Sequence, residues 1–354
     1  MTDREGVVRR SFEQQAELCE SFGSLFTARL IRAIDKAIDR KSKTGAAILT
    51  WQGPPEAKGD ALALRVTSAL HALVLSGRNE RLAAVYPPAP LREQSDLTEV
   101  IRSVVDEHDE ELLPWLTLAP QTNEVGRAAA LYLGLLEIRR QLDMPVRLFE
   151  IGSSAGLNLV LDQYEYDFGG EVHGRKGSPV RLSPVWEGPA PGLKHGALVA
   201  ERQGCDLSPL DVTDPSDVLR LRAYIWPDQR VRQERFSRAI ALAAEERPQI
   251  DVASAEDWIP SVITEDRTDG SVTVLMHSLV YCYLPAEAQQ KITDHMQALG
   301  DKATPDNPLA WVSYELNDKN HTELSLRIWP GAEERIVADG HPHVTTLRYL
   351  KAPE

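Results

Sequence analysis

The residues best suited to chemistry lie in residues 146–159, which read V-R-L-F-E-I-G-S-S-A-G-L-N-L. An apolar run ends in the acid Glu150, two glycines follow, and apolar spacing then resumes. This pattern predicts a buried strand, a tight turn and a helix, with backbone N–H groups and the positive end of the helix facing a ligand. We therefore expect a ligand-binding crevice at this turn, with Glu150, Gly152, Ser153, Ser154, Gly156 and Asn158 as the candidate binding residues.

The turn fits neither of the common glycine-rich phosphate motifs. A dinucleotide fingerprint G-x-G-x-x-G would need glycine at Ser154 and Leu157, and a phosphate loop would need a lysine after Gly156. The turn does fit G-x-S-x-G, the nucleophile elbow of the α/β-hydrolases, in which Ser154 would attack and Asp257 and His277 would complete a triad. An elbow normally follows several strands, whereas the preceding chain reads as helical. The serine hydrolase therefore stands as an alternative hypothesis.

Other groups with suitable chemistry flank this stretch. His277 ends a predicted strand, where its imidazole could act as a general base, and Tyr281 and Tyr283 in the following turn could orient a substrate. Arg127 lies at the start of a predicted helix, from which it could hold a substrate carboxylate, with Asn123 nearby. Structural explanations stay open for these residues, because a histidine at a strand end is often a scaffold residue and Asn123 suits a helix N-cap.

Composition narrows the class of protein. The chain has 354 residues, a formal charge of −14 and no block of Lys and Arg interleaved with aromatics, so nucleic acid is not an expected partner. Cys19, Cys205 and Cys282 are widely spaced, with no histidine at ligand spacing, which favours reduced thiols over disulfides or a metal site. No apolar segment approaches the ~18 residues that span a bilayer, so we expect a soluble, cytoplasmic protein with no membrane partner.

Periodicity divides the chain near residue 143. Before that point apolar residues recur at three and four, which predicts an all-helical N-terminal cap over residues 1–143. Short β-branched runs then alternate with helical segments, which predicts an α/β domain with a parallel sheet over residues 144–354. A Gly- and Pro-rich segment, residues 168–196, is predicted to be a loop that acts as a lid or a substrate wall. The predicted strands are 146–151, 197–204, 250–253, 272–279, 309–314, 334–337 and 345–349.

This order of elements favours a second interpretation of the turn. The acid and the glycines, with their spacing, resemble motif I of the class I S-adenosylmethionine methyltransferases, an acid-x-Gly-x-Gly-x-Gly turn after the first strand, in which Ser154 replaces the middle glycine. The resemblance implies that the turn binds the methionine part of S-adenosylmethionine. It also implies that Glu150 receives the ammonium group of this cofactor.

The same resemblance assigns roles at two later strand ends. Asp206 follows the second predicted strand, where the fold places an acid for the ribose hydroxyls. Glu256 and Asp257 follow the third predicted strand, in the segment that would contact adenine. A helix that begins at Ser254, with acids in its first turn, explains the same residues equally well.

Five segments of the chain resemble the bacterial family of unknown function named DUF2332. They read P-Q-T-N-E-V-G-R (120–127), F-E-I-G-S-S-A-G-L-N-L (149–159), G-C-D-L-S-P-L-D-V-T-D (204–214), I-W-P-D-Q-R (225–230) and H-S-L-V-Y-C-Y-L-P (277–285). The family is similar to methyltransferase-like Rossmann folds. The resemblance implies this fold, but it implies no activity.

We therefore expect an α/β protein with a Rossmann-like, methyltransferase-type parallel sheet and an all-helical N-terminal cap, with S-adenosylmethionine and a small-molecule substrate between them. The expected reaction is methyl transfer to the small molecule, with His277 as the base. Two alternatives are a serine hydrolase that uses Ser154 and a non-catalytic protein that binds a nucleoside-like ligand.

Overall fold

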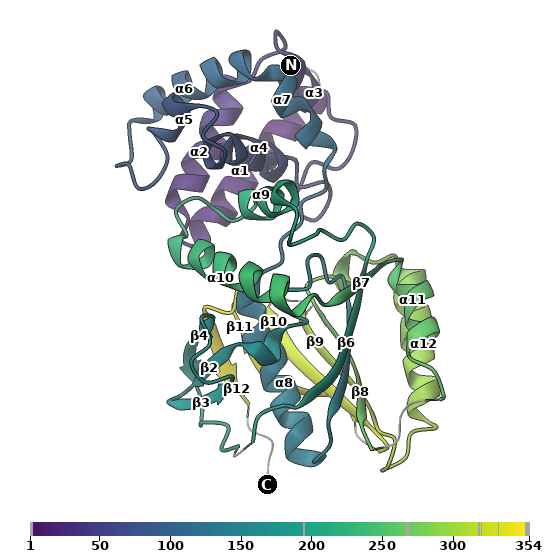
Figure 1. Cartoon of the computed structure of the whole chain (residues 1–354). Coiled ribbons are helices and arrows are strands. Elements are labelled where there is room, and N and C mark those ends of the chain that lie inside the picture. Colours follow the sequence, from purple (N-terminus) through teal and green to yellow (C-terminus); the bar gives the residue numbers. More distant parts are fainter. Residues whose placement is uncertain are drawn as a thin grey trace. The chain divides into compact units, whose positions relative to one another are not determined.

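The computed structural model of the chain describes residues 3–193, 195–266, 270–317, 319, 321–331 and 333–350. The chain forms two compact units (Figure 1). The first unit consists of Met1–Thr122 and Asp214–Glu234, and the second consists of Asn123–Thr213 and Arg235–Glu354. Within the described part, no helix has the length and apolar character needed to cross a membrane.

The first unit is helical, as its apolar periodicity predicts. Four of the apolar residues that recur at this spacing are buried in its core, namely Phe12, Cys19, Leu30 and Ile34. Its elements are α1 (Asp3–Ser21), α2 (Leu25–Ala37), α3 (Lys43–Leu49), α4 (Leu62–Leu75), α5 (Glu80–Ala83), α6 (Gln94–Glu107), α7 (Asp109–Leu112), η1 (Leu113–Thr117), α9 (Pro215–Ala223) and the start of α10 (Arg230–Glu246).

A segment from far along the sequence completes the helical unit. The Asp228 carboxylate accepts hydrogen bonds from the Ser24 hydroxyl and, at 3.0 Å, from the backbone N–H of Phe26, so it caps the N-terminus of α2. Trp226 stacks on Phe22 with 6.1 Å between the ring centroids. These contacts give the I-W-P-D-Q-R segment a structural role. They also explain why residues 214–234 join the helical unit, which a single boundary at residue 143 did not anticipate.

The helix α8 (Ala128–Gln141) belongs to the second unit, although its apolar stripe was predicted to end the cap. An added Cβ at Gly134 would lie 2.6 Å from Val312 Cγ1, so the backbone of α8 lies directly against β9 (Leu309–Leu316). The periodicity identified the helix correctly, but the surface that buries its stripe is a sheet. The division between the units consequently falls near Asn123 rather than at residue 143.

A nine-stranded sheet forms the centre of the second unit, in the order β5-β12-β11-β10-β9-β8-β1-β6-β7 (Figure 1). The strands β7 (Gln249–Val252), β6 (Val199–Asp206), β1 (Val146–Ile151), β8 (Val272–Ser278) and β9 are parallel. An antiparallel series of β10 (Thr322–Trp329), β11 (Arg335–Gly340) and β12 (Thr346–Tyr349) extends the sheet, and β5 (Val185–Glu187) pairs with β12. This architecture confirms the predicted α/β class, and its parallel strands follow the order of Rossmann-like sheets.

Helices cover both faces of this sheet (Figure 1). Trp311 of β9 packs against the core formed with α11 (Ala255–Val262) and α12 (Ala286–Gly300), whereas the next residue, Val312, meets α8. Successive side chains of a strand point to opposite faces, so α8 lies on one face and the pair α11 and α12 on the other. The sheet is therefore buried on both sides at its centre, so side chains that a ligand could reach are expected at the ends of the strands.

The crossover from β1 to β6 differs from the prediction, because none of its described residues forms an α-helix. Consecutive turns lead to η3 (Leu161–Gln163) and to a three-stranded sheet of β2 (Glu165–Phe168), β3 (Glu171–Gly174) and β4 (Arg181–Leu182). The predicted loop over residues 168–196 thus contains β3, β4 and β5, while residue 194 lies outside the described residues. The rings of Tyr132 in α8 and Tyr166 in β2 stack with 4.2 Å between centroids and attach the small sheet to α8.

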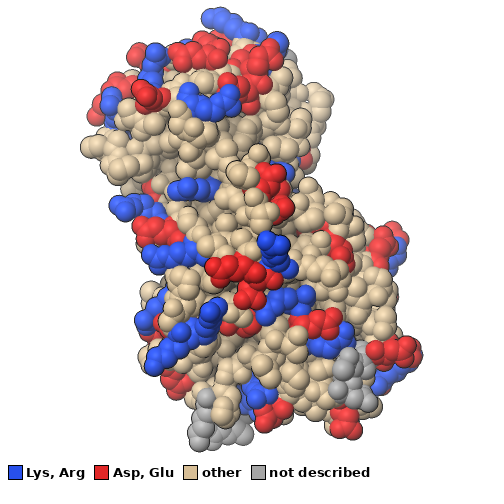
Figure 2. Space-filling view, in the orientation of Figure 1, with Lys and Arg blue, Asp and Glu red and all other residues tan. Residues whose placement is uncertain are grey.

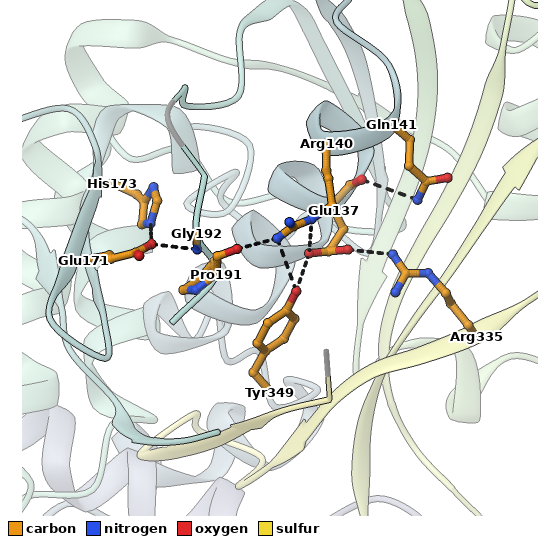
Figure 3. Close-up of polar contacts among 9 residues, drawn as sticks. All are labelled: Glu137, Arg140, Gln141, Glu171, His173, Pro191, Gly192, Arg335 and Tyr349. Carbon is orange, nitrogen blue, oxygen red and sulfur yellow. Dashed lines mark hydrogen bonds and ion pairs between the residues drawn. The ribbon is translucent and has the colours of Figure 1, made fainter. Parts of the chain in front are cut away.

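A buried ionic network ties α8 to the last strands (Figure 3). Glu137 is 1% exposed, and its carboxylate accepts hydrogen bonds from Arg335 of β11 and from the hydroxyl of Tyr349 of β12, each at 2.6 Å. Arg140 donates to Glu137 at 3.2 Å. Burial acts to raise the pKa of Glu137, but these hydrogen bonds and charges outweigh it and hold the pKa below its ordinary value. The network joins α8 to β11 and β12, and we assign it a structural role.

Acidic and basic side chains are intermixed on the face of the molecule that Figure 2 shows. Several exposed charges form ion pairs, such as Arg32 with Glu20 and Arg147 with Glu201, each at 2.6 Å. On this face the described Lys and Arg residues therefore do not gather into one continuous basic surface.

Candidate functional site

The carboxyl ends of β1 and β8 mark the point at which the strand order of the parallel sheet reverses. From β1 the chain adds β6 and β7 on one side, whereas β8 and β9 lie on the other. In open α/β sheets, the ligand crevice lies outside the carboxyl ends of the strands at this position. Glu150 and the turn after β1 stand on one side of it, and His277 with the segment after β8 stands on the other.

The turn after β1 alternates between left-handed and ordinary backbone. Gly152, Ser154 and Gly156 have φ angles of 66°, 53° and 73°. Ser154 therefore adopts a left-handed conformation that favours glycine, at a cost of about 1–2 kcal/mol. This alternation cannot continue as an α-helix, so the predicted helix N-terminus and its dipole are wrong for these residues. The backbone N–H of Leu157 donates instead to the side chain of Asn123, at 2.8 Å.

Glu150 is buried at the end of β1, with 1% of its surface exposed. Its Oε2 atom has no hydrogen-bond partner among the described residues, and neither has Oδ1 of the buried Asn158. Burial raises the pKa of Glu150 to about 8, against hydrogen bonds from Asn158 and Ser153 and the charge of Arg127, which lower it. A buried carboxyl with an unsatisfied oxygen is costly, and a ligand that brings a cation or a donor would remove that cost.

Ser153 is also buried, and it fixes the backbone beneath Glu150. Its hydroxyl donates to the backbone carbonyl of Glu150 at 2.9 Å. Gly204 of β6 makes room for it, because a Cβ at Gly204 would lie 2.0 Å from Ser153 Oγ. The glycine of the G-C-D segment is thus explained by its close approach to the turn.

Asp206 ends β6 and holds the turn from the neighbouring strand. Its Oδ2 atom accepts a hydrogen bond from the backbone N–H of Ser154, and its Oδ1 atom accepts one from Ser208, each at 2.9 Å. The Ser154 carbonyl in turn accepts from the N–H of Leu210 at 3.2 Å. The structure therefore brings Asp206 to the turn, as its predicted position at a strand end implies.

Arg127 and Asn123 reach this edge from the segment before α8. Asn123 fixes the turn through the bond described above. The buried guanidinium of Arg127 donates to the carbonyls of Pro342 and Ser278, at 3.2 and 3.3 Å. Arg127 thus links the end of β8 to the loop after β11, and its charge acts to lower the pKa of Glu150.

His277 is buried in β8 with both ring nitrogens engaged. Its Nε2 atom accepts a hydrogen bond from the indole N–H of Trp311 at 2.9 Å, and Nδ1 carries the proton donated to Glu315 at 2.7 Å. The ring of Tyr281 stacks on the imidazole with 5.0 Å between centroids. Both ring nitrogens are thus engaged in this conformation, so the predicted role of His277 as a general base would require one of them to be released.

Glu315, at the carboxyl edge of β9, is a site residue that the sequence reasoning missed. Besides His277, the same Oε1 atom accepts the backbone N–H groups of Val280 and Tyr281, at 3.0 and 3.1 Å. Burial acts to raise the pKa of Glu315, but these hydrogen bonds outweigh it and hold the pKa below its ordinary value. A signal was present, since Glu315 directly follows the predicted strand 309–314, much as Glu150 closes the run of β1.

The remaining predicted residues are not buried, although Tyr281 contacts His277 and Glu315 as described above. The Tyr281 hydroxyl donates to the carbonyl of Gln289 in α12 at 2.7 Å, and Tyr283 is 61% exposed. Glu256 and Asp257 lie in the first turn of α11, whose N-cap is Ser254. This position agrees with the helix-start explanation of the two acids.

The three groups of the hydrolase alternative do not assemble into a triad. The ring nitrogens of His277 contact Glu315 and Trp311, as described above. Asp257 accepts the hydroxyl of Ser254 at 2.8 Å. His277 is consequently not positioned to activate Ser154 in this arrangement.

Apolar side chains and a cavity border the polar edge. Leu207, just after β6, and Val252, at the end of β7, are 75% and 76% exposed. A cavity of about 380 Å³ lies at the ends of β10 and β11, where Thr322, Asp339 and His341 contribute to its lining. Among the described residues, no group of three or more His, Cys, Asp or Glu side chains is arranged to hold a metal ion.

Comparison with known proteins identifies a family. A family model described as an uncharacterized protein conserved in bacteria (DUF2332) matches residues 9–348. No curated protein and no solved structure matches the chain significantly.

Proposed function

We propose that this chain, which belongs to the DUF2332 family of bacterial proteins, binds S-adenosylmethionine at the carboxyl edge of β1 and transfers its methyl group to a small-molecule acceptor. The observation that carries the proposal is the buried carboxyl of Glu150, whose Oε2 atom lacks a partner. This carboxyl stands where the strand order reverses, beside a turn with left-handed backbone at alternate positions.

The groups at this edge suit the parts of S-adenosylmethionine. The ammonium group of the cofactor is both a cation and a hydrogen-bond donor, which the unpartnered oxygens of Glu150 and Asn158 require. Asp206 lies one strand away, about 4.8 Å across the sheet, and offers a carboxylate to the ribose hydroxyls. The exposed side chains of Leu207 and Val252 offer apolar surface to the adenine ring.

The proposed reaction depends mainly on alignment. Bound S-adenosylmethionine supplies an electrophilic methyl group, and the protein holds it in line with the acceptor. A cation beside Glu150 favours the ionised carboxylate, so ligand binding should lower its pKa from about 8. Because the nitrogens of His277 are engaged, we assign this residue to the scaffold of the acceptor side and not to proton transfer.

A thermal-shift titration with S-adenosylmethionine and S-adenosylhomocysteine tests the binding. At 100 times the dissociation constant, a ligand that binds only the folded state stabilises it by about 2.7 kcal/mol. We expect this shift in the wild type and in the control Glu137→Gln, whose carboxylate contacts Arg140, Arg335 and Tyr349 and not the turn after β1, and a smaller shift in Glu150→Gln. The absence of a shift in the wild type would contradict the proposal.

The engaged nitrogens of His277 favour one alternative, a non-catalytic protein that binds a nucleoside-like ligand. Incubation of the protein with S-adenosylmethionine and a bacterial metabolite extract separates the two functions. A methyltransferase accumulates S-adenosylhomocysteine, and Glu150→Gln abolishes this accumulation. A binding protein shows the thermal shift without the product. A serine hydrolase would instead be labelled at Ser154 by a fluorophosphonate, and Ser154→Ala would remove the label.

A further inference from the structure

We infer that Glu315 is a positioning residue that clamps residues 279–283, the segment after β8, over the turn that follows β1. This segment then forms a gate that a ligand must open to reach the turn. The role as a gate rests on the proposed function, whereas the clamp is a property of the protein by itself.

The clamp consists of three hydrogen bonds to one carboxylate oxygen. Oε1 of Glu315 accepts from Nδ1 of His277 at 2.7 Å and from the backbone N–H groups of Val280 and Tyr281 at 3.0 and 3.1 Å. The Oε2 atom is buried without a partner among the described residues. All three hydrogen bonds of this carboxylate are therefore made with β8 and the gate. Hydrogen bonds to an ionised acceptor are roughly twice as strong as those between neutral groups.

Both ends of the gate are held by neighbouring elements. On the β8 side, the backbone N–H of Leu279 donates to the carbonyl of Tyr314 at 3.0 Å. On the α12 side, the side chain of Gln289 donates to the carbonyls of Tyr281 and Leu284, at 2.9 and 3.0 Å. Between these anchors, Glu315 holds the backbone N–H groups of Val280 and Tyr281.

The backbone of the gate is strained at its start. Leu279 has a φ angle of 47°, in the left-handed region that leucine rarely adopts. Such a conformation persists only where the surrounding structure enforces it. Opening the gate would release this strain. The closed state therefore depends on the hydrogen bonds to Glu315 that oppose opening.

The gate covers the turn through Val280. A Cβ added at Gly152 would lie 2.4 Å from Cγ2 of Val280, so the valine side chain rests directly on the glycine backbone. A ligand that approaches Gly152 from this side has to displace Val280. Displacing Val280 also breaks its N–H bond to Glu315, which couples ligand entry to the clamp.

Amide hydrogen exchange tests the clamp directly, because two of its bonds are backbone N–H groups. We compare the wild type with Glu315→Gln, which keeps the shape of the side chain but removes its charge, and with Glu137→Gln as a control for general destabilisation. In Glu315→Gln we expect the amides of Val280 and Tyr281 to exchange at least tenfold faster, with β8 unchanged. In Glu137→Gln these two amides should exchange as in the wild type. No acceleration, or an equal acceleration throughout β8 and β9, overturns the inference.

Association kinetics with S-adenosylhomocysteine test the gate. Val280→Ala keeps both backbone bonds but removes the side chain that covers Gly152, so it opens the turn without breaking the clamp. We expect the ligand to associate several-fold faster with Val280→Ala and with Glu315→Gln than with the wild type. Equal association rates in all three proteins would overturn the inference that residues 279–283 form a gate. If the ligand binds none of them, the proposed function and the gate both fail, whereas the exchange experiment still decides the clamp.

Discussion

Replacing Glu150 with glutamine should change how the stability of the protein depends on pH. Burial raises the pKa of this carboxyl in the folded state to about 8 from its ordinary value of 4.5. Between these two values, the folded state holds a proton that the unfolded chain has released, so folding becomes less favourable as the pH rises. The stabilising contribution is fully present below about pH 4.5 and is lost as the pH approaches 8. At about 1.4 kcal/mol per pH unit, the free energy of unfolding falls by up to roughly 5 kcal/mol across this window.

Urea unfolding of both proteins at intervals across this pH window measures the effect. Glutamine does not titrate, so the free energy of unfolding of Glu150→Gln minus that of the wild type should increase with pH. Glu137→Gln is the matched control, because Glu137 is equally buried but has a pKa below its ordinary value. The contribution of Glu137 is present above its ordinary pKa and is lost as the pH falls. A difference for Glu150→Gln that stays constant or shrinks as the pH rises would show that the pKa of Glu150 is not raised in the folded state.

Three further substitutions test the turn and the helical unit. Ser154→Gly should raise the free energy of unfolding by about 1 kcal/mol in urea titrations, because glycine adopts the left-handed backbone without strain; a loss of stability would contradict this. Asp206→Ala should weaken S-adenosylhomocysteine binding about tenfold in calorimetry, or about 1.4 kcal/mol, and an unchanged affinity would remove its ribose role. Asp228→Ala removes the cap of α2 and should lower stability by about 1 kcal/mol in thermal denaturation, while an unchanged melting temperature would argue against the cap.

Helices and strands could be predicted from the sequence where the pattern of apolar residues depends only on which side chains are buried. The strand 146–151 was predicted with the bounds that β1 has, because its side chains are buried on both faces. The helix predicted after the turn is wrong, although Leu157, Leu159 and Val160 are buried as a helix would bury them. The spacing of these apolar residues indicates that they are buried, but it does not determine their backbone angles. The left-handed residues before them prevent a helix from starting.

The positions of the site residues could be predicted where those residues lie at the ends of predicted strands. Glu150, Asp206 and His277 were each expected at the end of a predicted strand, and the structure places all three at the carboxyl edge of the parallel sheet. What each side chain contacts could not be predicted, since the partners of His277 come from β9, 34 and 38 residues further along the chain. No local sequence pattern indicates such a pairing, which engages both ring nitrogens of the histidine that was expected to act as a base.

We propose above that the carboxyl edge of β1 binds S-adenosylmethionine through Glu150. A crystal structure of the protein with S-adenosylhomocysteine tests it most directly. We predict that the ligand lies on the turn after β1, with its amino group within about 3 Å of the Glu150 carboxylate, a hydrogen-bond distance for a charged pair. A ligand bound elsewhere, such as in the cavity beside Thr322, or crystals that stay free of ligand at saturating concentration, would contradict the claim.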